Sequence, residues 1–169
     1  MKKIVVIGPE STGKSTLTQQ LAQHFNCPAV EEYARQYIDR LDRPYAKDDL
    51  LAIARGQLAL EDELMHATVP YLFCDTDLRV INIWSIIRYG HAHPWITDQI
   101  KKRKYHGYLL MNVDLPWQKD PQREHEHQLD ELFERYHEDL KNSGVPFSII
   151  SGQGEERIQH AIDFLLSLD

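Results

Sequence analysis

The chain has 169 residues and a formal net charge of −7, with 42% hydrophobic and 27% charged residues. This length suits one domain with a full-sized core, and the acidic balance argues against a nucleic-acid-binding surface. No apolar run approaches the ~20 residues of a membrane-spanning helix, so we expect no membrane insertion. The two cysteines, Cys27 and Cys74, lie far apart without metal-ligand spacing, and Met1-Lys2-Lys3 leads straight into a strand-like run. We therefore expect a reduced, cytoplasmic protein.

Short apolar runs alternate with helical patterns along the chain. We expect strands over 4–7, 29–30, 71–74, 108–113 and 147–150. Apolar residues at helical spacing predict helices over 14–25, 33–41, 48–67, 78–89, 123–142 and 155–168. This alternation predicts an α/β fold, in which a five-stranded parallel sheet of order 2-3-1-4-5 has helices on both faces. Ligands of such sheets bind beyond the carboxyl ends of the strands, so the residues that follow each strand are candidate site residues.

A phosphate-binding motif follows the first expected strand. Residues 8–15 read Gly-Pro-Glu-Ser-Thr-Gly-Lys-Ser, a G-x-x-x-x-G-K-[ST] motif without a mismatch. The glycines allow backbone N–H groups to point at phosphate oxygens, and the next helix adds its positive N-terminal end. Lys14 is expected to reach the β- and γ-phosphates of ATP, and the Ser15 hydroxyl to ligate Mg²⁺. The motif predicts a P-loop NTPase, a three-layer sandwich spanning 1–169 as one domain. The residues expected to bind ATP here are Gly8, Glu10, Ser11, Thr12, Gly13, Lys14, Ser15 and Thr16.

Three classes of P-loop protein compete for this sequence: a small-molecule kinase, a GTPase or ATPase switch, and a motor or nucleic-acid ATPase. A GTPase should carry N-K-x-D for guanine, and the nearest string, Gln118-Lys119-Asp120, does not fit. A motor needs more chain and usually a basic surface. Small-molecule kinases are compact, with acidic residues after the second and third strands and arginines on a mobile lid. This chain offers all three features.

Five short motifs stand in a fixed order along the chain. They are GPESTGKS at 8–15, EYAR at 32–35, DTD at 75–77, HP at 93–94, and PWxxD at 116–120 followed by Arg123. This ordered set resembles the NadR-like ribosylnicotinamide kinase family over nearly the whole chain. The resemblance implies ATP-dependent phosphorylation of the 5′-hydroxyl of a ribonucleoside, with nicotinamide riboside as the leading acceptor. Kinases for another nucleoside or nucleotide, and an ATP-binding switch that acts through a protein partner, are the alternatives.

Bifunctional members of that family join the kinase unit to an adenylyltransferase domain. The adenylyltransferase nucleotide motif and any helix-turn-helix segment are missing here, so we expect the kinase unit alone, in functional pairing with an adenylyltransferase.

Two positions depart from the family pattern. Glu31 stands where members that use nicotinamide riboside carry an aromatic residue; a carboxylate attracts the cationic pyridinium but offers no stacking surface. The lid, expected over 114–124, usually reads D-G-x-R, whereas here Pro121 replaces the glycine in Asp120-Pro121-Gln122-Arg123. Because proline fixes φ, this lid is expected to close differently.

Acidic residues after the second and third strands are the candidate catalytic groups. Asp75 is placed to hold Mg²⁺ through water. The alternative is that Asp75 caps the next helix, a role that Thr76 or Asp77 could serve equally well. Asp77 is expected to bind ribose hydroxyls or to take the acceptor proton. Its alternative role is to cap the next helix. Glu32 is expected to take the proton of the acceptor hydroxyl; a solvated glutamate in the first helical turn is its alternative.

The remaining candidates lie on the first helix turn after the second strand and on the loops. Arg35 either pairs with Glu32 or contacts phosphate, and Arg123 is the lid arginine that neutralises transition-state charge. Trp117 either anchors the lid or faces the substrate. The loop at Gly152 either packs on adenine, as in related kinases, or is a plain turn. The expected substrate-binding residues are Glu31, Glu32, Tyr33, Arg35, Asp77 and Trp117.

Overall fold

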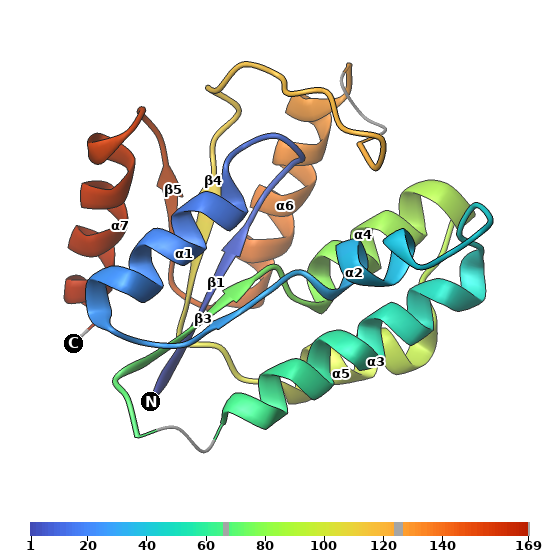
Figure 1. Ribbon diagram of the computed structural model, residues 1–169, viewed down its shortest axis with the longest axis horizontal. Coiled ribbons are helices and arrows are strands. Elements are labelled where there is room, and N and C mark those ends of the chain that lie inside the picture. The colour runs from blue at the N-terminus through green and yellow to red at the C-terminus, as the bar shows by residue number, and fades with distance from the viewer. Residues whose placement is uncertain (66–67, 124–126, 169) are drawn as a thin grey trace.

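The computed structural model describes residues 1–65, 68–123 and 127–168, and its centre is a five-stranded parallel sheet (Figure 1). The strands lie in the order β2-β3-β1-β4-β5, so the predicted fold class and strand order are confirmed. Their bounds are Lys2–Ile7 for β1, Ala29–Val30 for β2, Tyr71–Asp75 for β3, Gly107–Met111 for β4 and Phe147–Ile150 for β5.

Helices cover both faces of this sheet (Figure 1). Their bounds are Lys14–Phe25 for α1, Tyr33–Asp39 for α2, Lys47–Leu64 for α3, Leu78–Tyr89 for α4, Pro94–Lys102 for α5, Leu129–Ser143 for α6 and Glu155–Ser167 for α7. Helices α1 and α7 pack on one face, and α3, α4 and α6 pack on the other. Within the described ranges, none of these helices combines the length and apolar character that crossing a bilayer requires.

The central strand β1 is buried on both faces, as its β-branched run predicts. Ile4 and Val6 point into the cluster made with α1 and α7, whereas Val5 and Ile7 point into the cluster made with α4 and α6. All four side chains are fully buried. Successive residues of a strand face opposite sides, so a central strand between two helical layers must be apolar at every position.

A third apolar cluster joins α2, α3, α4 and α5 beyond the edge of the sheet. It is centred on Ile53, Ile81 and Ile96, each buried. This helical extension holds α2 and α4 side by side and so shapes the walls of the cavity described below.

Helix α5 was not predicted from the sequence. Its start is the HP motif itself, because His93 Nδ1 accepts a hydrogen bond from the Trp95 backbone N–H at 3.1 Å and Pro94 takes the first helical position. Proline suits that position because its missing N–H has no helical partner there. The helix is nine residues long, with Ile96 buried and Trp95 and Ile100 packed against the same apolar cluster, so its amphipathic pattern was present in the sequence and was overlooked.

The helix predicted over 123–142 begins instead at Leu129. The residues before Leu129 are polar and have no apolar side chain to bury against the sheet, so Arg123 lies in a loop. Residues 124–126, including the last residue of the expected lid, lie outside the described ranges. The same holds for 66–67 at the end of the helix predicted over 48–67; α3 itself ends at Leu64.

The ring of Tyr33 lies directly over Gly56 in the middle of α3, where an added Cβ would stand 2.0 Å from Tyr33 Cε1. Glycine to alanine within a helix ordinarily stabilises by about 1 kcal/mol. Here we expect Gly56→Ala to lower the free energy of unfolding by about 1–3 kcal/mol, because the ring must leave its site. Urea unfolding measures the change.

The matched control is the double variant Tyr33→Ala/Gly56→Ala, in which no ring opposes the methyl group. The cost of Gly56→Ala should vanish in the Tyr33→Ala background. An equal cost in both backgrounds would refute the steric account.

Candidate active site

The phosphate loop, residues 8–15, joins β1 to α1 and runs against the end of β4. Gly8 has φ +144°, and a Cβ there would stand 3.0 Å from the carbonyl oxygen of Met111. Gly13 has φ +80° and is followed at once by the first residue of α1. Thr12 Oγ1 donates to the Pro9 carbonyl at 2.8 Å and closes the loop on itself. The glycines of the motif are therefore required by backbone conformation and by the close approach to β4.

Lys14 and Asp75 bring opposite charges to this loop. Lys14 Nζ donates to the Pro9 carbonyl at 2.8 Å, so its ammonium lies across the loop. Asp75 ends β3, is 4% exposed, and has an Oδ1 atom without a hydrogen-bond partner among the described residues. Burial raises the pKa of Asp75, and this effect is opposed by Lys14 and by a hydrogen bond from Ser15.

A buried carboxylate oxygen beside a serine hydroxyl is the oxygen-only donor set that suits Mg²⁺. In the described part of the chain, no group of three or more His, Cys, Asp or Glu side chains could hold a metal ion. Ser15 and Asp75 could therefore hold an ion only together with oxygens from a bound ligand and water.

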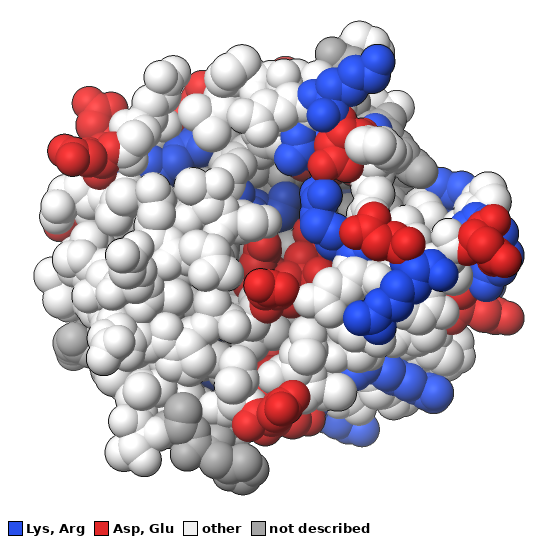
Figure 2. All heavy atoms as spheres, in the orientation of Figure 1, with Lys and Arg blue, Asp and Glu red and all other residues white. Residues whose placement is uncertain are grey.

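A cavity of about 460 Å³ opens beside the phosphate loop. The whole loop lines one side, together with Thr16. Helix α2 contributes Arg35, and Glu32, the residue before the first residue of α2, also lines the cavity. Helices α4 and α6 contribute apolar and aromatic side chains. The cavity is thus polar and charged toward the loop and apolar at the opposite end. Figure 2 shows acidic and basic side chains side by side near the middle of this face.

Glu32 lies where the charged and apolar parts of the cavity meet. It directly precedes α2, and a side chain from α3 fixes the backbone on both sides of it: Tyr33 N donates to Gln57 Oε1 at 2.9 Å, and Gln57 Nε2 donates to the Glu31 carbonyl at 3.4 Å. Burial raises the pKa of Glu32; Lys14 opposes this shift. The structure therefore supplies a carboxylate of increased basicity close to the phosphate loop.

The lid segment, residues 114–123, lies over the phosphate loop and reaches α2 (Figure 1). Gln118 N donates to Ser11 Oγ at 2.7 Å, and Arg123 Nη1 approaches the same hydroxyl at 3.4 Å and donates to the Gln118 carbonyl. Arg35 Nη1 pairs with Asp120 Oδ2 of the lid at 2.9 Å. Arg35 was expected to pair with Glu32 or to contact phosphate; its ion pair in the structure is instead with Asp120 of the lid segment.

Three residues expected to bind substrate lie elsewhere than in the cavity lining. Glu31 is exposed and accepts a hydrogen bond from Gln36 Nε2 at 3.0 Å. Tyr33 packs on α3, as described above. Trp117 belongs to the lid, where the guanidinium carbon of Arg123 lies 6.0 Å from its ring centroid. The substrate-binding role predicted for Glu31, Tyr33 and Trp117 is therefore not supported by the lining of this cavity.

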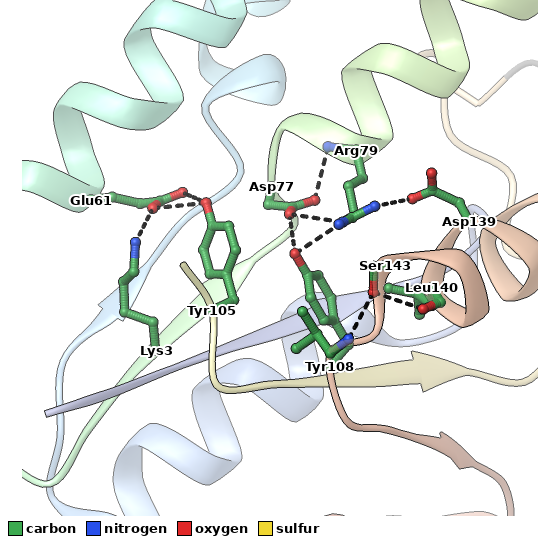
Figure 3. A network of polar contacts seen from close by, with 10 residues as sticks. Lys3, Glu61, Asp77, Arg79, Tyr105, Tyr108, Asp139, Leu140 and Ser143 are labelled. Atoms are coloured by element: carbon green, nitrogen blue, oxygen red, sulfur yellow. Dashed lines mark hydrogen bonds and ion pairs between the residues drawn. The ribbon is translucent and has the colours of Figure 1, made fainter. Parts of the chain in front are cut away.

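Asp77 and Gly152 also lie outside the lining. Asp77 is 1% exposed and caps α4, accepting from Arg79 N at 2.9 Å and from the Tyr108 hydroxyl at 2.8 Å (Figure 3). Gly152 has φ +93°, and its N–H donates to Asp114 Oδ2 at 2.8 Å. Of the DTD motif, Asp75 lies beside the phosphate loop, and Asp77 takes the capping role that was its alternative.

The apolar end of the cavity was missed from the sequence. It is lined by Val80, Ile83, Trp84 and Ile87 of α4 and by Tyr136 of α6. The apolar spacing over 78–89 predicted a helix, and that pattern alone assigns its apolar face to the core. Periodicity gives the face of a helix but does not say whether side chains or a ligand will cover it.

Arg157 of α7 was also missed, because it is remote in sequence from everything it contacts. It is 5% exposed, donates from Nη1 to the Thr12 carbonyl at 2.8 Å, and pairs through Nη2 with Asp114. It therefore ties the phosphate loop to the start of the lid segment. Its isolated position between glutamates and isoleucine carries no sequence signal for this contact.

Arg157→Met should lower the free energy of unfolding by about 3 kcal/mol, since it leaves the buried Thr12 carbonyl and Asp114 without their partner. The control is Arg135→Met, which breaks an exposed pair with Glu131 on α6. That change should stay within about 0.5 kcal/mol. Equal urea midpoints for the two variants would contradict the clamp that we assign to Arg157.

The chain is 27% identical over 126 residues to the trifunctional NAD biosynthesis/regulator protein NadR of Salmonella typhimurium (strain LT2), and equally to that of Escherichia coli (strain K12). Each match covers 71% of this chain but 30% of the relative, so the chain spans less than a third of the length of these proteins. The similarity to NadR that the ordered motifs predicted is confirmed.

Solved structures agree on the fold. The crystal structure of NadR protein in complex with NR matches with a TM-score of 0.80 at 24% identity, over 99% of this chain and 49% of that chain. The structure of deoxyadenosine kinase from M. mycoides matches with a TM-score of 0.66 at 15% identity, over 98% of this chain and 99% of that chain. A model of the AAA domain family matches residues 3–157, and with this match over most of its length the chain belongs to that family.

Proposed function

We propose that the protein is an ATP-dependent kinase that phosphorylates the 5′-hydroxyl of a ribonucleoside, with nicotinamide riboside as the leading acceptor. One observation carries the proposal: the phosphate loop and Glu32 line one cavity whose far end is apolar. The loop is suited to a triphosphate, the carboxylate to a hydroxyl proton, and the apolar end to a base.

The apolar end of the cavity favours a kinase over an ATP-binding switch. A switch needs room for the nucleotide alone, whereas this cavity continues past Lys14 to Val80, Ile83 and Trp84. A second compartment continuous with the phosphate loop is what a phosphate acceptor requires. The structural likeness to a deoxyadenosine kinase agrees with this choice.

The proposed transfer uses residues of this chain in separate roles. The acceptor 5′-oxygen attacks the γ-phosphorus, the bond from that phosphorus to the β,γ-bridging oxygen breaks, and ADP leaves. Glu32 takes the hydroxyl proton, and the raised pKa of this side chain makes it a better acceptor than an ordinary glutamate. Lys14 and Arg123 neutralise the charge that develops on the phosphoryl oxygens.

Mg²⁺ fits this site because Ser15 and the unpartnered Oδ1 of Asp75 are oxygen donors beside the loop. When bound there, the ion would neutralise charge on the β- and γ-phosphates. Asp75 would hold it through water, and Ser15 would ligate it directly.

Two observations bear on the acceptor. Position 31, where related kinases carry a stacking aromatic residue, lies outside the cavity lining. The aromatic side chains on which a base could stack are instead Trp84 and Tyr136. Arg35 is already paired with Asp120, which favours an uncharged 5′-hydroxyl over an acceptor that carries a phosphate. The phosphorylated product would be passed to an adenylyltransferase, with which we propose a functional pairing.

Purified protein, assayed with ATP and Mg²⁺ against a panel of nucleosides that includes nicotinamide riboside, should form a 5′-monophosphate. ATP hydrolysis without acceptor should be slow, because a closed lid excludes water. Lys14→Ala should reduce transfer by about 10²-fold or more, as loss of one electrostatic stabiliser does. The exposed Lys102→Ala is the control. If no nucleoside stimulates ATP turnover, the kinase proposal fails and the switch takes its place.

Glu32→Gln should reduce transfer by about 10²-fold to 10⁴-fold while leaving ATP affinity nearly unchanged, since the amide cannot take the acceptor proton. In the wild type, transfer should fall as the pH drops through the pKa of Glu32, which burial places above the usual 4.5. Below that pKa the carboxyl is protonated and cannot act as a base. A pH–rate profile of kcat measures this acid limb. If the residual activity of Glu32→Gln shows the same limb at the same pH, the limb belongs to another group.

A further inference from the structure

A buried polar network lies directly beneath the first turn of α4 (Figure 3). Asp77 accepts from the backbone of Arg79 and from the Tyr108 hydroxyl, and Arg79 Nε donates to that same hydroxyl at 3.1 Å. The Arg79 guanidinium also lies 5.4 Å from the centroid of the Tyr108 ring. Burial raises the pKa of Asp77 to about 6, opposed chiefly by Arg79, so the carboxylate is ionised at neutral pH. These contacts fix the Arg79 side chain in one orientation.

The far end of Arg79 reaches α6. Its Nη1 donates to Asp139 Oδ2 at 2.5 Å, and the side chains of Arg79 and Asp139 are 11% and 34% exposed. A partly buried pair whose arginine is already held on its other side loses little side-chain entropy on forming. The pair is therefore a firm link between the start of α4 and the middle of α6.

Both linked helices line the apolar end of the cavity. Val80, the residue after Arg79, lines it from α4, and Tyr136 lines it from α6. Asp139 is three residues beyond Tyr136, on the same side of the helix. Arg79 and Asp139 themselves are outside the lining, so the link acts on the cavity through the neighbouring wall residues.

We propose that the Arg79–Asp139 pair sets the separation of α4 and α6 and thereby the affinity and size preference of the protein for its acceptor. The inference rests on the proposed kinase function and assigns both residues as positioning residues. Removing Asp139 leaves Arg79 with Asp77 and Tyr108, so the buried network stays satisfied while the connection to α6 is lost.

Asp139→Ala is the primary variant, and Glu138→Ala is its matched control. Glu138 is the preceding residue of α6, carries the same charge and is exposed. Asp139→Ala should raise the KM of the acceptor about fivefold, as loss of one ion pair of about 1 kcal/mol would. The KM of ATP should be unchanged, because the phosphate loop does not contact this pair. Asp139→Asn, which still accepts a hydrogen bond from Arg79, should have an intermediate effect.

A second readout separates positioning from stability. The ratio of kcat/KM for a single-ring nucleoside to that for a two-ring nucleoside should move toward unity in Asp139→Ala, since the walls are no longer held at one spacing. Urea unfolding of each variant shows how much protein is folded in the assay. A merely structural role would lower activity toward all acceptors equally.

If the wild type is active and Asp139→Ala has the same acceptor KM and the same preference ratio as the wild type, the inference is overturned. The kinase proposal then stays intact. An equal rise in KM for Glu138→Ala would overturn it as well, because the effect would then come from charge alone. A wild type that phosphorylates no nucleoside would overturn the proposed function, and the inference with it.

Discussion

Parallel pairing of β1 with both β3 and β4 is the constraint on which the site depends. Val6 stands opposite Asp75 of β3, and Ile7 stands opposite Leu110 of β4. The three strands therefore end at one edge of the sheet, where the phosphate loop, the buried carboxylate and the lid segment all begin. Parallel pairing needs helical crossovers between the strands, and these helices supply the cavity walls. The connectivity of the sheet thus determines which residues line the site.

The two ends of the cavity are held by different means. At the loop end, glycine conformations and the Arg157 contact hold the phosphate loop against β4 and the lid segment, which leaves little freedom. At the apolar end, helices α4 and α6 are joined by apolar packing and the Arg79–Asp139 pair. In the kinase that we propose, a rigid phosphate loop beside a more adjustable apolar end would suit the reaction, because triphosphates are alike whereas acceptors differ.

The phosphate loop could be predicted because residues close in sequence encode it, and the sheet order because alternating strands and helices with right-handed crossovers leave few arrangements. The DTD motif marks the limit of that approach. Asp75 and Asp77 are chemically alike and two residues apart, yet Asp75 lies beside the phosphate loop, whereas Asp77 caps α4 and binds Tyr108 of another strand. Arg157 contacts Thr12 across 145 positions, and no local pattern encodes such a pair. Polar contacts between residues far apart in the chain could not be predicted from the sequence.

The contact between the lid segment and α2 has a consequence for the conditions in which the protein works. Arg35 and Asp120 are 47% and 19% exposed, and surface pairs of this kind contribute at most about 1 kcal/mol. Dissolved salt screens such a pair, with a Debye length of about 8 Å at physiological ionic strength. Ionic strength therefore acts directly on the strength of this contact between the lid segment and α2. Concentrated salt would favour uncovering and faster exchange of ligands, whereas dilute buffer would favour retention.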